Sequence, residues 1–562
     1  MERFSPYPEL APNLAAMMFR CARAWPRRPM LRSFRGGAWV GMDWGTFGRQ
    51  AASVARHLRA MGVGAGDRVL IVSENRPEYP IVETALMAIR AVPVPTYTTN
   101  TAGDHAHILA DSGARVALVS TPELAAVVGA AGALDRLVVF DSAEWAAMIG
   151  DDLPADDIAA EADLIPGGAL ACLIYTSGTG GAPRGVMTPH RSVLSNCKGA
   201  YRLLRILGFE DQGEVYLSYL PLSHSYEHTA GQFFMLSVGA EIVYSRGVEH
   251  LAADMLAMRP TILTMVPRVL EVIRGRILAG LGKQPALRQA LFHKTLALGL
   301  KKLDGVRLGP VDWLADRVLE RLVREKVRQR FGGRVRAVIS GGARLEPEIG
   351  RFYLALGVTL IQGYGQTEAG PVIAANLPDR IRTETVGPPL EGVELRLAED
   401  GEILVRGDLV MDGYWGKPVE TAAAIQDGWL HTGDIGVVEA DGYLRITDRK
   451  KDMIVLSGGD NVSPARVEGM LVAEPAIAQA VVFGDGRAGI AALVVPAEGY
   501  DETAAAAAVS AVNMRLSVVE RIRRHAAVGA FTIDNGQMTA TQKVRRHVVR
   551  AAYSDVLARL GV

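Results

Sequence analysis

Short apolar runs rich in β-branched residues recur along this 562-residue chain as far as about residue 385, with stretches of helical character between them. Strands covered on both faces are apolar along their whole length, so this alternation predicts an α/β fold with mostly parallel, buried sheets. Beyond residue 385 short strands and turns replace the pattern, and the last hundred residues read as a smaller α+β unit. The runs are residues 68–72, 116–119, 137–140, 241–244, 261–265, 336–339 and 359–361.

Composition narrows the class of protein. Lysine plus arginine and aspartate plus glutamate each number 61, so no net charge draws the chain to nucleic acid. The three cysteines, Cys21, Cys172 and Cys197, form no CxxC pair, which argues against a zinc site and suits a reducing compartment. No signal-peptide pattern opens the chain, and no apolar run reaches the ~18 residues of a membrane span. We therefore expect a cytoplasmic protein of two or more domains.

The run Tyr175-Thr-Ser-Gly-Thr-Gly-Gly-Ala-Pro-Arg-Gly-Val186 begins as a buried strand and breaks into a loop of glycines and hydroxyls. Free backbone N–H groups and hydroxyls in such a loop suit a polyphosphate, because glycine lets the backbone approach the ligand closely. The run is not a Walker A loop, which needs Gly-x-x-x-x-Gly-Lys-Ser/Thr. Taken alone, it also fits an ordinary flexible surface loop.

This run resembles the phosphate loop of the adenylate-forming (AMP-binding) enzymes, the superfamily of acyl-CoA synthetases, luciferases and adenylation domains. Their usual form is Tyr-Thr-Ser-Gly-Thr-Thr-Gly-x-Pro-Lys-Gly-Val. Here Gly180 replaces a threonine and Arg184 replaces the lysine, so the cation is a planar fork instead of a mobile point charge. The resemblance implies that the phosphates of ATP are held by Thr176, Ser177, Gly178, Thr179, Gly180, Gly181 and Arg184.

Three further motifs match the same superfamily in the same order, at residues 340–345, 363–368 and 429–434. The first two follow predicted strands, where α/β sheets present ligand sites. The resemblance implies that Tyr364 stacks on adenine, Thr367 contacts phosphate and Glu368 holds Mg²⁺, a cation that prefers oxygen ligands. Asp434 and Arg449 would hold the ribose. The base would be lined by the backbone of Gly341, Gly342 and Ala343 and by the glycines that flank the tyrosine, Gly363 and Gly365.

The charged stretch at residues 448–452 resembles the family's hinge, with Lys451 at the hinge position. It predicts a large domain over residues 1–448 and a mobile one over 449–562. Gly458 and Gly459 would approach the pantetheine arm of coenzyme A. Residues 535–546 resemble the loop of the catalytic lysine, which places Lys543 at that position, and Ala540 stands where a proline is usual.

Residues 94–101, 217–224, 259–271 and 484–487 resemble the long-chain fatty acyl-CoA synthetase branch, in which His224 would lie where the acyl and adenylate pockets meet. The implied reaction converts a medium- to long-chain fatty acid, ATP and coenzyme A into acyl-CoA, AMP and pyrophosphate. The implied catalytic set is Lys543, Glu368, Thr176 and His224. Two alternatives stay open: a ligase that loads an acyl carrier protein, and a degenerate non-catalytic member of the family that binds a nucleotide or a lipid. Short-chain and aryl acids also remain open as substrates.

Residues 283–336 carry 14 lysines and arginines against 5 acidic residues, although the whole chain is neutral. Apolar residues recur between them at helical spacing. The pattern fits a core-packed helix with a solvated charged face, or a peripheral contact with the inner face of a membrane. The apolar set is Leu314, Val318, Leu319, Leu322, Val323, Val327 and Phe331.

Overall fold

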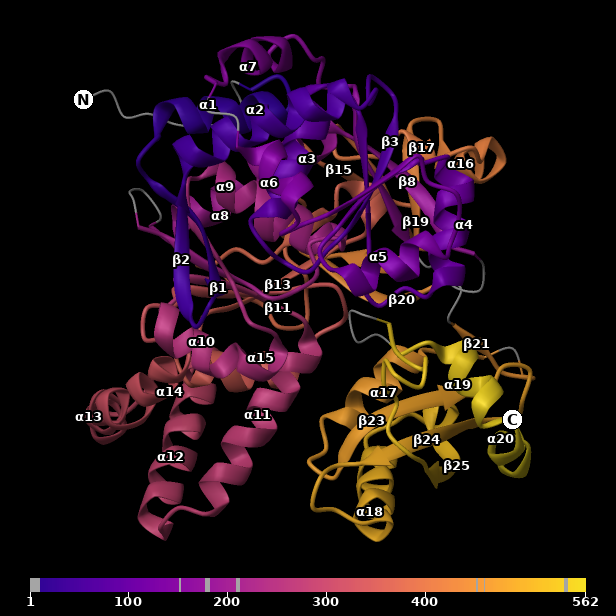
Figure 1. Cartoon of the computed structure of the whole chain (residues 1–562). Coiled ribbons are helices and arrows are strands. Elements are labelled where there is room, and N and C mark those ends of the chain that lie inside the picture. The colour runs from indigo at the N-terminus through magenta and orange to yellow at the C-terminus, as the bar shows by residue number, and fades with distance from the viewer. Residues whose placement is uncertain are drawn as a thin grey trace.

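The computed structural model describes residues 11–150, 153–176, 182–208, 213–450, 453–458, 460–539 and 544–562. A large N-terminal part contains stacked sheets and helices, and the part after residue 453 lies beside it as a smaller unit (Figure 1). Both the predicted α/β class and the α+β character of the last hundred residues are confirmed.

The largest sheet has eight strands in the order β14-β13-β12-β11-β9-β10-β1-β2. Its six central strands are parallel, while β2 and β14 pair antiparallel at the two edges. The central strands β9 to β12 are short and mostly buried, which is why they read as plain apolar runs in the sequence. The strands are β1 Pro29–Arg35, β2 Ala38–Asp43, β9 Val215–Ser218, β10 Glu241–Tyr244, β11 Ile262–Met265, β12 Ala337–Ser340, β13 Leu360–Gly365 and β14 Val372–Ala375.

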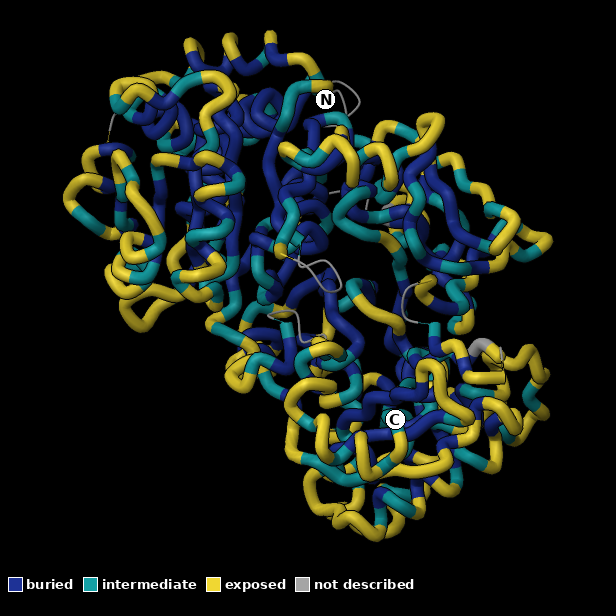
Figure 2. Tube along the Cα trace, turned by 90° about the vertical axis from the view of Figure 1, so that its right-hand side faces the viewer, coloured by how far each residue is buried: buried dark blue, intermediate teal, exposed yellow. Residues whose placement is uncertain are grey.

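A second, parallel sheet has the order β4-β3-β5-β6, and an antiparallel sheet has the order β17-β8-β7. Figure 2 shows that the interior of the large part is buried. Side chains of the first helices, such as Leu14, Phe47 and Leu86, pack in one core cluster with Val69, Leu118 and Val138 of the parallel sheet. The strands are β3 Arg68–Val72, β4 Val92–Thr96, β5 Val116–Val119, β6 Arg136–Val139, β7 Leu170–Thr176, β8 Arg184–Pro189 and β17 Gly413–Tyr414. The helices are α1 Leu14–Ala24, α2 Trp44–Ala60, α3 Glu78–Ala88, α4 Ala102–Ser112, α5 Pro122–Gly129, α6 Ala143–Ile149, α7 Asp156–Ala162 and α8 His190–Ile206.

Two helical regions follow α8. The first contains the π-helix η2 and lies within the core; the second is a group of long helices that projects at the lower left of Figure 1. We call this projecting group the helical arm, residues 267–330. Within the described ranges, no helix combines the length and the apolar character that crossing a bilayer requires. The elements are η2 Glu227–Phe233, α9 Phe234–Ser237, η3 Val248–His250, α10 Leu251–Met258, α11 Pro267–Gly282, α12 Ala286–Leu303, α13 Pro310–Leu319, π-helix η4 Glu320–Arg324, α14 Glu325–Arg330, α15 Pro347–Ala355 and η5 Thr367–Ala369.

Residues 394–449 form a smaller sheet, and the C-terminal unit forms a three-stranded sheet in the order β23-β24-β25. Residues 480–483 pair antiparallel with 491–494, with Ala480 opposite Val494. The alanine run at 504–508 is helical, and Ala505 and Ala508 are buried. The elements are β15 Glu394–Leu397, β16 Glu402–Arg406, α16 Pro418–Ala424, β18 Ile425–Gln426, β19 Trp429–Val438, β20 Leu444–Arg449, β21 Ile454–Val455, β22 Asn461–Val462, α17 Pro464–Val472, β23 Ile477–Phe483, β24 Ile490–Pro496, α18 Glu502–Asn513, η6 Val518–Glu520, β25 Ile522–Ala527, α19 Arg546–Ala552 and α20 Ser554–Leu560.

Candidate active site

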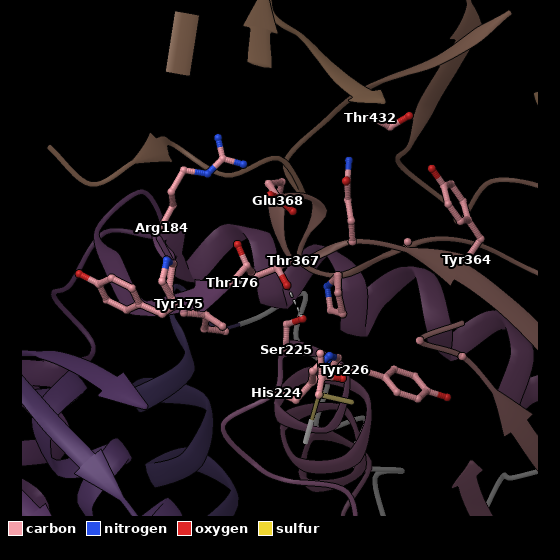
Figure 3. Close-up of a pocket in the computed structure, with 18 of the residues that line it drawn as sticks. Tyr175, Thr176, Arg184, His224, Ser225, Tyr226, Tyr364, Thr367, Glu368 and Thr432 are labelled. Atoms are coloured by element: carbon pink, nitrogen blue, oxygen red, sulfur yellow. Dashed lines mark hydrogen bonds between the residues drawn. The ribbon is translucent and has the colours of Figure 1, made fainter. Parts of the chain in front are cut away.

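A cavity of about 1960 Å³ lies where the carboxyl ends of β12 and β13 meet the β7–β8 hairpin, β19 and residues 533–550 of the C-terminal unit. Most of the described residues that the sequence predicted for the site line it, although Ala343, Asp434 and Gly458 do not. Figure 3 shows Arg184, Thr176 and Glu368 near one another, with Tyr364 some way from them and His224 and Ser225 between. The predicted residues on the lining are Thr176, Arg184, His224, Gly341, Gly342, Gly363, Tyr364, Gly365, Thr367, Glu368 and Arg449.

The β7–β8 hairpin forms the end of the cavity that would hold phosphates. Thr176 and Arg184 are direct cross-strand partners, so the β7–β8 ladder extends as far as these two residues. Tyr175 supports the hairpin from below, since its hydroxyl donates to Asp111 (2.8 Å), which also pairs with Lys417 (3.1 Å). The predicted phosphate ligands Ser177, Gly178, Thr179, Gly180 and Gly181 lie outside the described residues.

Tyr414 is a site residue that the sequence reading missed. Strand β17 places it opposite Val186 on β8, and the Arg184 guanidinium lies over its ring at 4.2 Å from the centroid. Its hydroxyl donates to Oε1 of Glu368 (2.8 Å). One tyrosine thus contacts both the candidate phosphate cation and the candidate metal carboxylate. A lone Gly-Tyr pair 46 positions after Glu368 gives no sequence signal, because only the β8–β17 pairing brings the two together.

The opposite end of the cavity is built from glycines and one tyrosine. A Cβ on Gly365 would lie 1.8 Å from the carbonyl oxygen of Pro371, and one on Gly341 would lie 2.8 Å from the Tyr226 ring, so no larger residue fits at either position. The Tyr364 hydroxyl donates to Oδ2 of Asp434 (2.7 Å), and Arg449 donates to Oδ1 (3.0 Å). Burial and the neighbouring Asp434 carboxylate raise the pKa of Tyr364, which keeps it a donor. Asp434 therefore lies just behind the lining, held by two residues that do face the cavity.

His224, Ser225 and Thr367 lie between the two ends. The hydroxyls of Ser225 and Thr367 are 2.8 Å apart, as the dashed line in Figure 3 marks. Nδ1 of His224 accepts a hydrogen bond from the Tyr226 backbone N–H (3.2 Å), which leaves Nε2 as the protonated nitrogen of the neutral ring. His224 can therefore offer a donor at the middle of the cavity, where its polar and apolar parts meet.

The third part of the cavity is apolar, and the sequence reading did not foresee its lining. We call it the apolar branch, lined by α8, by η2 with its flanking turns, and by Leu390. Four-residue spacing brings Tyr226, Ala230 and Phe234 onto one side of η2, with Ala230 the smallest of the three. The α8 residues on the lining are Ala200, Leu203 and Leu207. A wall of aliphatic and aromatic side chains joined to a polar chamber suits an amphipathic acid.

A buried carboxyl lies in η2, facing away from the cavity. Glu227 accepts hydrogen bonds from Tyr216 (2.8 Å) and Ser218 (2.6 Å), and no cation is among its hydrogen-bond partners in the described part of the chain. Burial raises the pKa of Glu227 to about 7, because a charge there would be poorly solvated. The next residue, His228, hydrogen bonds through Nε2 to Glu83 (2.6 Å). This polar network anchors η2 from behind, while its other side lines the apolar branch.

The C-terminal unit closes the cavity with Thr539, Val544, Arg545, Arg546 and His547, among others. Arg546 is anchored to that unit through Glu468 (2.8 Å) and the Val482 carbonyl oxygen (2.5 Å). The segment 540–543, which includes the predicted catalytic Lys543, lies outside the described residues, as do Lys451 and Gly459. Gly458 is exposed and away from the cavity lining.

Among the described residues, no three histidine, cysteine or acidic side chains converge on a ready-made metal cage. Glu368 offers a carboxylate on the lining beside Thr176 and Arg184. Mg²⁺ is commonly held by one or two carboxylates, water and the substrate's own phosphates. The residues present therefore fit Mg²⁺ that arrives with a nucleotide, and fit poorly a metal held by protein alone.

Comparison with known proteins agrees with this geometry. Residues 18–415 match the family model of the AMP-binding enzymes, and residues 451–560 match that of the AMP-binding enzyme C-terminal domain. The long-chain-fatty-acid–CoA ligase FadD15 of Mycobacterium tuberculosis is 35% identical over 509 residues, which is 86% of this chain and 82% of that protein. The peroxisomal long chain acyl-CoA synthetase 6 of Arabidopsis thaliana is 30% identical over 490 residues, which is 80% of this chain and 67% of that protein.

Among solved structures, a benzoate CoA ligase from Burkholderia xenovorans superposes with a TM-score of 0.75 over 96% of this chain and 99% of that one. The sequence identity is 23%, so this likeness establishes the fold. The family models and the relatives at 30% identity or more establish kinship. The chain belongs to the AMP-binding enzyme family and is an AMP-forming acid–thiol ligase.

Proposed function

We propose that this chain activates a medium- to long-chain fatty acid with ATP and transfers the acyl group to coenzyme A. The observation that carries the proposal is that one cavity contains three parts: the β7–β8 hairpin suited to phosphates, the glycine-lined wall with Tyr364, and the apolar branch. His224 lies where these parts meet. The long-chain ligases among its relatives support the choice of substrate. A carrier protein as acceptor is not favoured, since both of these relatives are named as CoA-dependent enzymes.

In the first half-reaction the fatty carboxylate attacks the α-phosphorus of ATP, and the bond to the bridging oxygen breaks to release pyrophosphate. Thr176, residues 177–181 and Arg184 hold the β- and γ-phosphates, and Tyr414 fixes the plane of Arg184 through its ring. Gly341 to Ala343 and Tyr364 bind adenine, while Asp434 and Arg449 bind the ribose. Mg²⁺ held by Glu368 and the phosphates would neutralise part of the charge on the leaving group.

Each carboxylate oxygen of Asp434 already accepts one side-chain hydrogen bond, from Tyr364 at Oδ2 and from Arg449 at Oδ1. A carboxylate oxygen can accept a second hydrogen bond, so ribose hydroxyls can bind Asp434 beside these donors or in place of one of them. If Tyr364 turns its hydroxyl away, its ring becomes free to lie along the base.

For the second half-reaction we propose the domains 1–448 and 449–562, joined at the hinge residue Lys451. Rotation of the smaller domain would withdraw Lys543 and bring Gly458 and Gly459 toward the acyl-AMP. The coenzyme A thiolate then attacks the acyl carbonyl carbon, and AMP leaves with its phosphate oxygen. Arg268 of α11 donates to the carbonyl oxygen of Ala478 in β23 (2.6 Å), a contact between the two domains that such a rotation must break.

Pyrophosphate release with ATP and Mg²⁺ across acids from C2 to C18, with and without coenzyme A, tests the proposed function. We expect turnover that requires coenzyme A and is greatest with long acids. About one equivalent of pyrophosphate regardless of coenzyme A would point to a carrier-protein acceptor. If no acid of any length supports pyrophosphate release, the proposal is contradicted, and the chain would be a family member that only binds its ligands.

Lys543→Ala tests the assignment of the catalytic lysine. We expect adenylation to fall by about 10²–10³-fold, because a preorganised cation no longer stabilises charge at the reacting centre. Thioester formation from supplied acyl-AMP should be nearly unchanged, since the rotated state does not use Lys543. An equal loss in both half-reactions would contradict this division of labour.

The finer proposal on partners is a peripheral contact between residues 283–336 and the inner face of a membrane. The basic residues of this segment do not act as one set. Arg324 is buried and pairs with Asp316 (2.7 Å), and Arg328 pairs with Glu320 (2.6 Å), so both stabilise the arm. Arg317 and Arg321 are exposed instead. Neutralising all the arginines together would therefore unfold the arm and would say nothing about lipid.

A further inference from the structure

One face of the helical arm exposes a continuous row of large apolar side chains. Val311, Leu314 and Val318 of α13 and Leu322 of η4 are 81, 60, 51 and 46% exposed. Their spacing of three, four and four residues places them along one side of the helix. We call these four residues the apolar stripe. Single exposed apolar residues are ordinary, but exposing a row of four on one helix to water is energetically unfavourable.

The other side of the same helix is firmly anchored, which fixes the direction of the stripe. Asp312 pairs with Lys294 (3.0 Å) and Lys301 (3.2 Å) of α12, and Asp316 pairs with Lys302 (3.0 Å). Leu319 is buried. In Figure 1, α13 lies at the outer left edge of the molecule, with α12 and α14 between it and the main body. The stripe therefore faces solvent because its helix is held from behind, and it is not free to turn inward.

Cations lie beside the stripe without acids to neutralise them. Arg317 and Arg321 follow Leu314 and Val318 by three residues each, so they run along one edge of the stripe. Neither of them, nor Arg307 just before α13, has an acidic partner within the described ranges, whereas Asp304, Asp312, Asp316 and Glu320 of this region are all paired. Arg317 also lies over the half-exposed Trp313 ring at 4.6 Å. Apolar side chains bordered by arginine and tryptophan are the composition of a helix that lies in a bilayer interface.

The chain that follows the arm contacts a segment next to the apolar branch. After α14, Arg336 donates to the carbonyl oxygen of Gly208 (3.1 Å) and Arg334 to that of Gly213 (3.2 Å). Leu207, one residue before Gly208, lines the apolar branch. The arm is thus joined through residues 331–336 to the C-terminal end of α8, one of the walls of that branch.

We propose that the apolar stripe, with Arg307, Arg317 and Arg321 beside it, is a docking surface for an anionic lipid bilayer. The stripe enters the boundary between headgroups and acyl chains, and the guanidinium groups contact lipid phosphates. A neutral bilayer lacks the net negative charge that attracts the guanidinium groups. An acidic soluble protein lacks the apolar layer that the stripe would enter. The use of this surface, which is to collect a water-insoluble acid at the membrane, rests on the proposed function, but the binding itself does not.

Vesicle flotation with the full chain tests the proposal, using phosphatidylcholine alone and an equimolar mixture with phosphatidylglycerol. We expect the wild type to float with the anionic vesicles and to be released by high salt. Leu314→Glu/Val318→Glu should reduce the apparent affinity by at least about tenfold, and Arg317→Gln/Arg321→Gln by about 30-fold, since each of the two basic residues near the surface contributes about 1 kcal/mol. The matched control is Val419→Glu on α16, which is 77% exposed and far from the arm in Figure 1.

Trp313 gives a local measurement of depth. Lipids brominated on their acyl chains should quench part of the fluorescence of the wild type, and Trp313→Phe should lose that part. The proposal is overturned if the wild type does not bind anionic vesicles, if it binds both lipids equally, or if Val419→Glu is as weak as the stripe variant. A dimer in solution that the stripe variant abolishes would show that a second copy of the chain occupies the surface.

Turnover of a short, water-soluble acid without vesicles separates this proposal from the proposed function. We expect the stripe variant to keep that turnover within about twofold of the wild type, since none of its altered residues lines the cavity. A wild type that floats but releases no pyrophosphate would contradict the proposed function alone. A stripe variant that loses both binding and soluble turnover would show that the stripe is structural, and would overturn the docking surface.

Discussion

Two π-helical segments of this chain, η2 and η4, lie in different surroundings. In η2 every residue except Ala230 is buried, and the segment forms a wall of the cavity. In η4 Arg324 is the buried residue, and the segment lies in the projecting arm. A π-helical turn shifts the phase of the side chains after it, and such turns are frequent at functional sites. In η2 the wider turn presents Tyr226, Ala230 and Phe234 to the cavity, whereas in η4 it turns Arg324 inward while Leu322 stays outside.

The acidic groups differ in the same way. Glu227 in η2 is held by hydroxyl groups, and burial raises its pKa to about 7. Asp316, one turn before η4, is paired with Arg324 and Lys302; although burial opposes them, these cations lower its pKa. Burial in the core segment thus favours the protonated form of its carboxyl, whereas in the arm paired cations favour the ionised form. The two segments should therefore respond differently to substitution and to pH.

The largest effect is expected from Ala230→Trp, which fills the apolar branch between η2 and α8. We expect kcat/KM for a C16 acid to fall by about 100-fold, because the acyl chain can no longer seat its carboxylate at the reacting position. A C4 acid should be nearly unaffected, since it does not reach Ala230. Pyrophosphate release with both acids measures the split.

Ala507→Trp is the matched control for this substitution, since it adds the same bulk on the exposed side of α18. It should change neither acid by more than about twofold. Equal losses for the C4 and C16 acids in Ala230→Trp would mean that η2 supports the site without lining the acyl path.

The next largest effect is expected from Glu227→Gln. Between the ordinary value near 4.5 and about 7, folded Glu227 holds a proton that the unfolded chain releases, so it adds stability below pH 4.5 that is lost as pH rises through 7. Glutamine does not titrate, so the stability of the variant relative to the wild type should rise from pH 4.5 to pH 8. The full pKa shift corresponds to about 1.4 kcal/mol per pH unit, and we expect a smaller total of roughly 2 kcal/mol. Paired thermal melts across this range measure the difference. A difference that does not change with pH would show that Glu227 is ionised in the folded protein.

A smaller effect is expected from Tyr414→Phe at the phosphate end of the cavity. The ring under Arg184 remains, but Glu368 loses the donor that orients its carboxylate. We expect about a tenfold loss of adenylation rate and a requirement for more Mg²⁺, at a nearly unchanged KM for the fatty acid. Initial rates over a Mg²⁺ series measure this.

Tyr443→Phe is its control. The hydroxyl of Tyr443 donates to the Arg380 carbonyl oxygen (2.9 Å) and arginines lie over its ring, but it is away from the cavity lining. Rescue of Tyr414→Phe by excess Mg²⁺, with no such effect in Tyr443→Phe, would identify Tyr414 as a positioning residue for Glu368. The same loss at every Mg²⁺ concentration would contradict that role.

The contiguous parts of the site were predictable from the sequence. Thr176 and Arg184 flank one loop, and Tyr364, Thr367 and Glu368 lie in one short run. Because the residues of each motif are close in the sequence, they are also close in space. Tyr414 was not predictable, because its role depends on β17 pairing with β8. The roles given to Lys451, Gly459 and Lys543 stay predictions.

Helix phase explains the remaining differences. The sequence predicts apolar residues at helical spacing here, and the structure divides them: Leu314, Val318, Leu319, Leu322, Val323, Val327 and Phe331. Leu319, Val327 and Phe331 are buried, whereas Leu314, Val318 and Leu322 are exposed. The division is already present in α13, where Val318 is exposed and the next residue, Leu319, is buried, so it precedes η4. Helical spacing predicts the helix, but which side of it is buried depends on the elements that pack against it.

The smallest effect is expected from Asp316→Asn in the arm. The stability that paired Asp316 contributes is present above its ordinary pKa near 3.8 and is lost as pH falls through its lowered folded value. We expect the variant to be less stable than the wild type at pH 7 by about 1 kcal/mol or less, because solvent screens part of the pair, and the difference should vanish once the pH lies below the lowered folded pKa of Asp316. Asp135→Asn, which breaks an exposed pair with Arg115, should cost almost nothing at any pH. The sign of the change with pH is then opposite to that of Glu227→Gln. Matching signs would mean that the carboxyl in η2 is stabilised as an anion like those of the arm, and that the difference between the two π-helical segments is only one of burial.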